Sequence, residues 1–167
     1  LYFYFQLEEI CSRKMVKDTM NNLINNDSEV IHNDNFDIKV INNEEYIGYL
    51  EIPSLNLLLP ITNGYSYNSL RKSPALYYGN LNSNLVICGH SYKAHFGNLY
   101  KLKQGDTVIF RDIINNRYVY EVEEVEILKP TEIKEMIESN FDLTLYTCTK
   151  DSKSRITIRC NRIGWFG

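Results

Sequence analysis

A cysteine at the end of a predicted strand is the residue of this sequence best placed for covalent chemistry. Cys148 ends the run 143–148, in which leucine alternates with threonine and tyrosine, a pattern that predicts a β-strand with one face turned inward. The polar segment 149–154 follows, so a thiol at this position could reach a substrate held across a sheet. Free cysteine is also among the most buried residue types, so this run alone fits a structural thiol equally.

A histidine and an arginine stand in comparable positions beside short apolar runs. His90 lies two residues after the run Leu85–Cys88, and Arg155 immediately precedes the run Ile156–Cys160. Imidazole can protonate a departing amine and later deprotonate an incoming one. A guanidinium stays charged and cannot act as a base, but it can donate hydrogen bonds to a substrate oxyanion and favour a nearby thiolate. With Cys148, these are the groups that a cysteine acyl transferase needs.

Other residues compete for the histidine and arginine roles. Arg159 and Arg162 follow Arg155 in the same apolar stretch, but Arg155 comes first after the segment that follows the cysteine. His32 lies in polar sequence far from any strand pattern, and His95 lies in a predicted short helix. No carboxylate has a local pattern that marks it as the acid of a triad.

The cysteine count leaves several uses open. The four cysteines, at positions 11, 88, 148 and 160, have no paired short spacing. In an extracellular protein they could form two disulfides, but Cys148 is better explained as a free nucleophile. Cys88-Gly89-His90 invites comparison with a zinc site, which however needs four ligands at recognisable spacings. We expect Cys88 and Cys160 to pack in a core, and we expect no metal and no cofactor.

Composition places the chain among soluble globular proteins of one domain. It has 167 residues, of which 44% are hydrophobic and 23% charged, enough for a sizeable core. A net charge of −3 gives no electrostatic reason to expect nucleic acid. Thirteen tyrosines and seven phenylalanines favour β structure without identifying a ligand.

The N-terminal quarter differs from the rest. Residues 7–26 predict a helix, because apolar residues recur near helical spacing, and the polar, asparagine-rich sequence up to residue 45 predicts a linker with one short strand at Ile38–Ile41. Residues 1–6, Leu-Tyr-Phe-Tyr-Phe-Gln, fit either a remnant of a cleavable tag or the aromatic exit of a transmembrane helix. No run of 18 apolar residues occurs.

Beyond residue 45 the sequence predicts about eight short strands with few helices between them. A break in alternation at Glu123-Glu124 predicts a β-bulge. Taken alone, this pattern indicates an all-β protein, either a barrel or a sandwich. The predicted strands are 46–52, 55–61, 75–78, 85–88, 107–113, 117–128, 143–148 and 156–160. Short helices are predicted at 66–72 and 132–139, and a helical turn or short helix at 92–102.

Five short motifs, in order, resemble the sortase family, the cysteine transpeptidases of Gram-positive cell surfaces. The family signature T-L-x-T-C matches Thr144–Cys148, and its G-H after an apolar strand matches Gly89-His90. F-x-x-L and G-D follow at Phe96–Leu99 and Gly105-Asp106, and Arg155 fits the arginine that begins a strand after the cysteine. The resemblance extends from Tyr46 to Ile163.

The resemblance implies a fold and a site. The fold is all-β with short helices, a closed eight-stranded β-barrel over residues 46–167, preceded by an N-terminal helix and polar linker over residues 1–45. The catalytic residues implied are Cys148, His90 and Arg155 on neighbouring strands, and Thr147 is a candidate for substrate binding.

The resemblance also implies a reaction. A transpeptidase of this kind recognises a C-terminal sorting motif of the LPxTG type in surface proteins, cleaves it, and holds the acyl fragment as a thioester on Cys148. An amine then takes the fragment, usually on a peptidoglycan precursor or on a pilin lysine. Since the enzyme would work outside the cell, we expect a single-pass membrane anchor upstream of Leu1 and an extracellular catalytic domain.

Two features bear on the subclass. The sequence has no Asp-Pro dipeptide, which argues against the lid-bearing, pilin-polymerising class. The segment between Leu128 and Leu143 is short, whereas class B members usually carry a longer helical insertion there. These features favour a class D-like or divergent class B enzyme.

Two other functions fit the same residues. A cysteine hydrolase would use the same three side chains and let water take the acyl group, which a product assay with and without an amine acceptor distinguishes. A non-catalytic β-barrel could bind a peptide on its edge strands with Cys148 buried, in which case the thiol would resist labelling at neutral pH.

Overall fold

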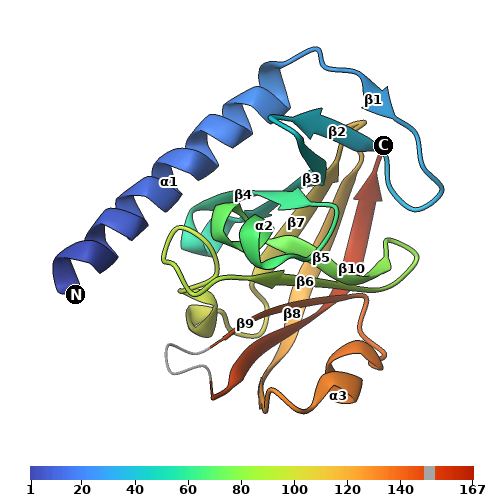
Figure 1. The fold of residues 1–167 in the computed structure, drawn as a ribbon. Coiled ribbons are helices and arrows are strands. Elements are labelled where there is room, and N and C mark those ends of the chain that lie inside the picture. The colour runs from blue at the N-terminus through green and yellow to red at the C-terminus, as the bar shows by residue number, and fades with distance from the viewer. Residues whose placement is uncertain (149–152) are drawn as a thin grey trace.

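In the described part of the chain, ten strands form one sheet, and eight of them close into a ring. The computed structural model describes residues 1–148 and 153–167, and of Cys148 the backbone only. The strand order is β1-β2-β3-β4-β5-β6-β9-β10-β8-β7, and an additional pairing of β3 with β7 closes the ring (Figure 1). The expected all-β fold with an eight-stranded closed sheet is therefore confirmed. The strands are β1 (Val30–Ile31), β2 (Ile38–Ile41), β3 (Glu44–Ile52), β4 (Leu57–Thr62), β5 (Ala75–Asn80), β6 (Ser83–Gly89), β7 (Thr107–Asp112), β8 (Arg117–Leu128), β9 (Leu143–Cys148) and β10 (Arg155–Phe166).

Helical segments connect or flank the strands. A capping box at Ser66, whose side chain accepts from the Ser69 N–H while the Ser69 hydroxyl accepts from the Ser66 N–H, starts the second helix. The helices are α1 (Tyr2–Asn25), α2 (Tyr67–Lys72) and α3 (Ile133–Ile137), with 3-10 turns η1 (Pro53–Leu55) and η2 (Leu99–Lys101).

The ring encloses the main core because strand residues alternate between its inside and its outside. Leu50, Ile61, Ile87, Phe110 and Leu145 all have zero exposure and belong to one apolar cluster. Burial of this kind is the main favourable term in folding. The alternate residues of β6 and β9 pack in a second cluster with α3, so these two strands are buried on both faces.

The predicted bulge in β8 is confirmed. Arg159 of β10 is opposite Glu124, whereas the next residue, Cys160, is opposite Val122, so Glu123 is the extra residue. Cys160 is fully buried, as expected, and burial raises the pKa of its thiol.

The N-terminal region departs from the sequence prediction. Helix α1 begins at Tyr2, five residues before the predicted start at Leu7, and includes most of the aromatic run. Its first residues are exposed on all sides, so no apolar periodicity marked them as helical. The predicted linker contains β1 as well as β2, and both extend the sheet beyond β3.

The segment 92–102 was predicted to be a helical turn or a short helix, and within it η2 is a single helical turn. The N–H groups of Phe96 and Gly97 donate to the carbonyls of His90 and Tyr92, at 3.0 and 2.8 Å, in bonds that do not follow the helical repeat. The segment is therefore a compact turn held by its own backbone bonds.

Helix α1 lies outside the strands and docks on them through its C-terminal half (Figure 1). Met20 and Leu23 pack with Ile41 and Tyr46 in a third apolar cluster. The Lys39 ammonium of β2 donates to the Leu23 carbonyl at 3.0 Å and also to the Asn26 carbonyl. A positive charge at this position stabilises the helix, because the C-terminal end of a helix carries partial negative charge. The sheet thus caps the helix that packs on it.

Substitution of two adjacent residues of similar size, Leu23 and Ile24, tests whether α1 docks on the sheet. Leu23 is 6% exposed and Ile24 is 54% exposed. Leu23→Ala should lower the free energy of unfolding by about 2–3 kcal/mol, because it leaves a cavity against the sheet. Ile24→Ala, the matched control, should change it by less than about 0.5 kcal/mol. Urea unfolding followed by circular dichroism measures both, and equal effects would contradict the docked position of α1.

Candidate active site

Strand pairing brings the three predicted catalytic positions to one edge of the sheet. In the parallel pair β6–β9, Gly89 is opposite Thr147, and in the antiparallel pair β9–β10, Cys148 is opposite Arg155. His90 and Cys148 each follow a paired residue directly. Because adjacent strands lie about 4.8 Å apart, the backbones of His90, Cys148 and Arg155 are neighbours. The Cys148 side chain and residues 149–152 lie outside the described part of the chain.

The residue before His90 must be glycine. A Cβ at Gly89 would stand 2.5 Å from the Phe96 ring, closer than side-chain atoms approach one another. Phe96 is fully buried, and its N–H donates to the His90 carbonyl at 3.0 Å. The G-H motif and the phenylalanine six residues later are therefore one packing unit, which fixes the backbone of His90 at the strand end.

His90 is half-buried and has an uncommitted ring nitrogen. Its Nδ1 is buried and has no hydrogen-bond partner among the side chains and backbone that the structure describes. The imidazole stacks on the Tyr92 ring, with centroids 3.8 Å apart and planes at 20°. Burial lowers the pKa of His90, Glu8 and Glu9 act in the opposite direction, and Arg71 reinforces the lowering.

Arg155 also has an unsatisfied group. Its Nη1 is buried and finds no partner in the described part of the chain, although the side chain as a whole is half-exposed. Arg155 lines a pocket of about 180 Å³. Three tyrosines of the pocket contact one another edge to face: Tyr65 with Tyr77 at 5.6 Å and Tyr77 with Tyr146 at 5.4 Å. The guanidinium thus adjoins an aromatic pocket.

The competing arginines are already engaged. Arg159 is 2% exposed and donates to the Glu126 carboxylate at 2.7 Å, the Thr144 hydroxyl at 2.9 Å and the carbonyls of Glu135 and Met136 at 2.7 and 3.0 Å. Arg162 is exposed and donates to a carbonyl at 3.3 Å. Arg159 therefore joins β10 to β8, β9 and α3, and Arg155 is the β10 arginine available to a ligand.

The other candidates are placed as follows. His95 is fully buried, burial lowers its pKa to about 4, and the ring therefore stays neutral without reaching the surface. His32 is exposed beyond β1 and pairs with Asp37 at 2.8 Å. Thr147 is 2% exposed, which leaves little of it for a substrate to touch, and its binding role stays a prediction. Within the described ranges no cluster of three or more His, Cys, Asp or Glu could hold a metal ion.

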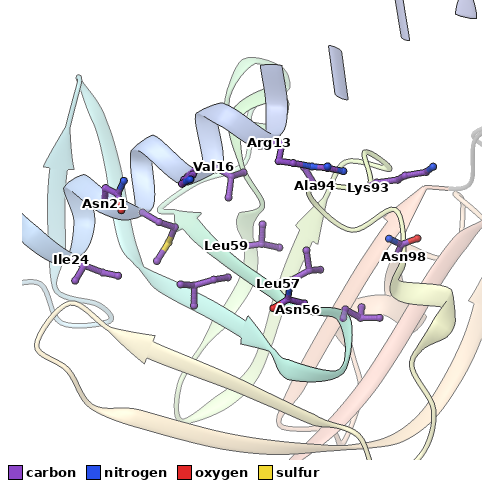
Figure 2. A pocket seen from close by; sticks show the side chains of 14 residues that line it. Arg13, Val16, Asn21, Ile24, Asn56, Leu57, Leu59, Lys93, Ala94 and Asn98 are labelled. Atoms are coloured by element: carbon purple, nitrogen blue, oxygen red, sulfur yellow. The ribbon is translucent and has the colours of Figure 1, made fainter. Parts of the chain in front are cut away.

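A larger groove lies elsewhere. Its volume is about 550 Å³, and it runs between α1, β4 and the segment after His90. Figure 2 shows the side chains of Val16, Leu57 and Leu59 facing into it, with Arg13 and Lys93 near its rim. Neither His90 nor Arg155 lines this groove. We therefore place the candidate active site at the ends of β6, β9 and β10, where His90, Cys148 and Arg155 are neighbours, and not in the larger groove.

The chain is similar to a family of known proteins. The Sortase domain model matches residues 50–163. Sortase A from Corynebacterium diphtheriae is 26% identical with a TM-score of 0.66, over 72% of this chain and 62% of that one. Sortase C1 from Streptococcus suis is 30% identical with a TM-score of 0.63, over 73% and 75%. Sortase C1 from Streptococcus agalactiae is 27% identical with a TM-score of 0.65, over 75% and 71%.

The chain belongs to the sortase family, as its motifs suggested, since the family model spans most of it. This membership supports a transpeptidase of the sortase type. No curated protein sequence matches the chain. The chain spans about 62% of the length of the Corynebacterium enzyme. In the described part of the chain, no helix is long and apolar enough to cross a bilayer.

Proposed function

We propose that this protein is a cysteine transpeptidase that cleaves an LPxTG-like sorting motif of surface proteins through a thioester on Cys148 and transfers the acyl group to a cell-wall amine. The observation that carries the proposal is the common strand edge at which the backbones of His90, Cys148 and Arg155 meet.

The proposed reaction has two acyl transfers. The Cys148 thiolate attacks the scissile carbonyl carbon, the C–N bond breaks, and the His90 imidazolium protonates the departing amine. An incoming amine then attacks the thioester, gives its proton to His90 and releases the thiolate. Arg155 donates hydrogen bonds to the carbonyl oxygen while negative charge develops on it.

The electrostatics of His90 suit both halves of this cycle. Burial lowers its pKa below the ordinary 6.5, so the imidazolium is a stronger proton donor toward the leaving amine. At neutral pH most rings are uncharged, which is the form that accepts a proton from the incoming amine. Arg155, whose charge is permanent, supplies the positive charge that His90 does not hold continuously.

The aromatic pocket beside Arg155 is the proposed site for the apolar residues of the sorting motif. Tyr65, Tyr77 and Tyr146 give it flat apolar walls, and Met136 of α3 adds a flexible one. A leucine or proline side chain there would leave the scissile carbonyl near the guanidinium that also lines the pocket.

Substitution of the three catalytic candidates tests the reaction. Cys148→Ala and His90→Ala should reduce cleavage of a fluorogenic sorting peptide to background. Arg155→Ala should lose on the order of 100-fold in kcat, as when one oxyanion donor is removed, and Arg155→Lys should not restore it, because lysine lacks the planar fork. Mass spectrometry with an added amine should detect the amide product, and free acid alone in its presence would favour a hydrolase. If Cys148→Ala still cleaved the peptide above background, Cys148 would not be the nucleophile.

Arg159 supplies the structural control. Arg159→Ala leaves Glu126 and the carbonyls of α3 without their donor and should lower the midpoint of thermal unfolding by several degrees. Arg155→Ala, whose Nη1 has no described partner, should leave the midpoint within about 2 °C. The reverse pattern would contradict the assignment of the two arginines.

Two adjacent tyrosines on β5 test the substrate pocket. Tyr77 lines the pocket, whereas Tyr78 is 48% exposed and does not. Tyr77→Ala should raise KM for the sorting peptide about tenfold, because the peptide loses a buried aromatic contact. Tyr78→Ala should leave KM unchanged. Circular dichroism melts check that both variants are folded, and equal KM values in the two variants would place the peptide elsewhere.

We further propose a peptidoglycan precursor or a comparable amine as acceptor, and an N-terminal membrane anchor that holds the domain outside the cell. Tyr2, Phe3 and Tyr4 of α1 are 77%, 73% and 64% exposed, and such aromatic residues suit the interface of a bilayer. A class D-like or divergent class B subclass remains the prediction from the sequence.

Cell fractionation tests the location. The full-length protein from native cells should sediment with membranes and be released by detergent, not by salt alone. Protease added to intact protoplasts should remove the catalytic domain, while a cytoplasmic marker survives. Recovery of the intact protein in the cytoplasmic fraction would refute the anchor.

A further inference from the structure

The His90 imidazole lacks the usual support of a catalytic base. A base of this kind is normally oriented by a third group that hydrogen-bonds its second nitrogen. Here Nδ1 is buried without a hydrogen-bond partner in the described part of the chain. The described contact that fixes the plane of the ring is its stack on Tyr92, at 3.8 Å and 20°.

Tyr92 is itself held by its own turn. It is 6% exposed, and its ring meets the His95 ring edge to face at 5.5 Å. Its carbonyl accepts from the N–H groups of His95 and Gly97, at 2.9 and 2.8 Å. A Cβ at Gly97 would lie 2.4 Å from the Ser91 carbonyl oxygen, so the tight turn depends on glycine there.

Helix α1 holds the same turn from outside. The Tyr92 hydroxyl donates to the Glu8 carboxylate at 3.5 Å, and Glu8 also pairs with Arg71 of α2 at 3.6 Å. Both oxygens of Glu9 accept from the Lys93 N–H at 3.1 Å. Two consecutive carboxylates of α1 therefore bind the second and third residues after His90, although 84 positions separate each pair in the sequence.

We propose that Tyr92 is a positioning residue for the acyl-transfer reaction: its ring, braced by Glu8 and Glu9 of α1, sets the plane of the His90 imidazole. The proposal rests on the proposed function, in which His90 moves protons. A stacked aromatic face takes the place of the hydrogen-bonding acid or amide that other catalytic bases use. Helix α1 is then part of the active-site scaffold.

Substitutions at Tyr92 separate the ring from the hydroxyl. Tyr92→Leu removes the stack and should lower kcat for a fluorogenic sorting peptide by on the order of 100-fold, with KM nearly unchanged, because small misplacements of a catalytic group have effects of this size. Tyr92→Phe keeps the ring and loses one long hydrogen bond, so kcat should stay within about threefold. Tyr100→Leu is the matched control, since Tyr100 is 59% exposed on η2 and should leave kcat unaltered.

A titration gives a readout that does not need activity. The groups that face His90 are Glu8 and Glu9 of α1, Arg71 of α2, and the neutral His95 of its own turn. Burial is the largest cause of its lowered pKa, so uncovering one face in Tyr92→Leu should raise the pKa toward 6.5. Nitrogen-15 NMR of the imidazole follows this titration, which Tyr100→Leu should not change.

A second variant protects the test against misfolding. Glu9→Ala removes the brace on Lys93 and keeps the Tyr92 ring, and it should lower kcat less than Tyr92→Leu does. If folded Tyr92→Leu has the kcat of the wild type and the same pKa of His90, the proposal is wrong. If Tyr92→Leu does not fold, the proposal is wrong when Glu9→Ala has the kcat of the wild type and the same pKa of His90. His90→Ala keeps the two ideas apart, because its full activity would refute the proposed function itself.

Discussion

The register between β6, β9 and β10 is the constraint on which the site depends. The pairs Gly89–Thr147 and Cys148–Arg155 come from different parts of the chain, and they bring three chemically distinct residues to one edge. A slip of one residue in either ladder would move every side chain of a strand to the opposite face. The relative positions of these three backbones therefore depend on the pairing of the strands.

Packing on both faces fixes that register. Leu85 and Ile87 face the main core inside the ring, whereas Val86 and Cys88 face the second cluster under α3. A strand buried on both faces cannot slip without exposing one apolar set and forcing the other into the wrong space. Arg159 also stabilises this register, because its four hydrogen bonds connect β10 to β8, β9 and α3.

The features that the sequence revealed are those encoded locally. The bounds of β8 and β9 follow from alternation of side chains, and the bulge at Glu123 follows from a break in it. The three candidate catalytic positions were chosen from short motifs, and the parallel pairing of β6 with β9 makes two of those motifs neighbours. Local pattern and tertiary structure agree here because the strands are short and strongly apolar.

The features that the sequence concealed depend on distant contacts. Tyr92 was predicted to open a helical turn or short helix, and nothing in that pattern placed its ring against His90, which lies before the segment. The braces from Glu8 and Glu9 join residues 84 positions apart. Nothing in the sequence around Glu8 and Glu9 distinguishes a carboxylate that accepts from a backbone N–H from one that faces water.

The contrast between Arg155 and Arg159 indicates how this fold separates stability from function. Arg159 is buried and donates four hydrogen bonds, one of them to the Glu126 carboxylate. Its charge is therefore compensated within the folded chain. Arg155 and His90 each keep a buried nitrogen without a described partner, an arrangement that costs about 1–3 kcal/mol for each group. A substrate carbonyl would satisfy the Arg155 guanidinium without reorganising the protein. These two nitrogens belong to residues at the strand ends where the proposed reaction occurs, whereas Arg159 lies four residue pairs further along the β9–β10 ladder.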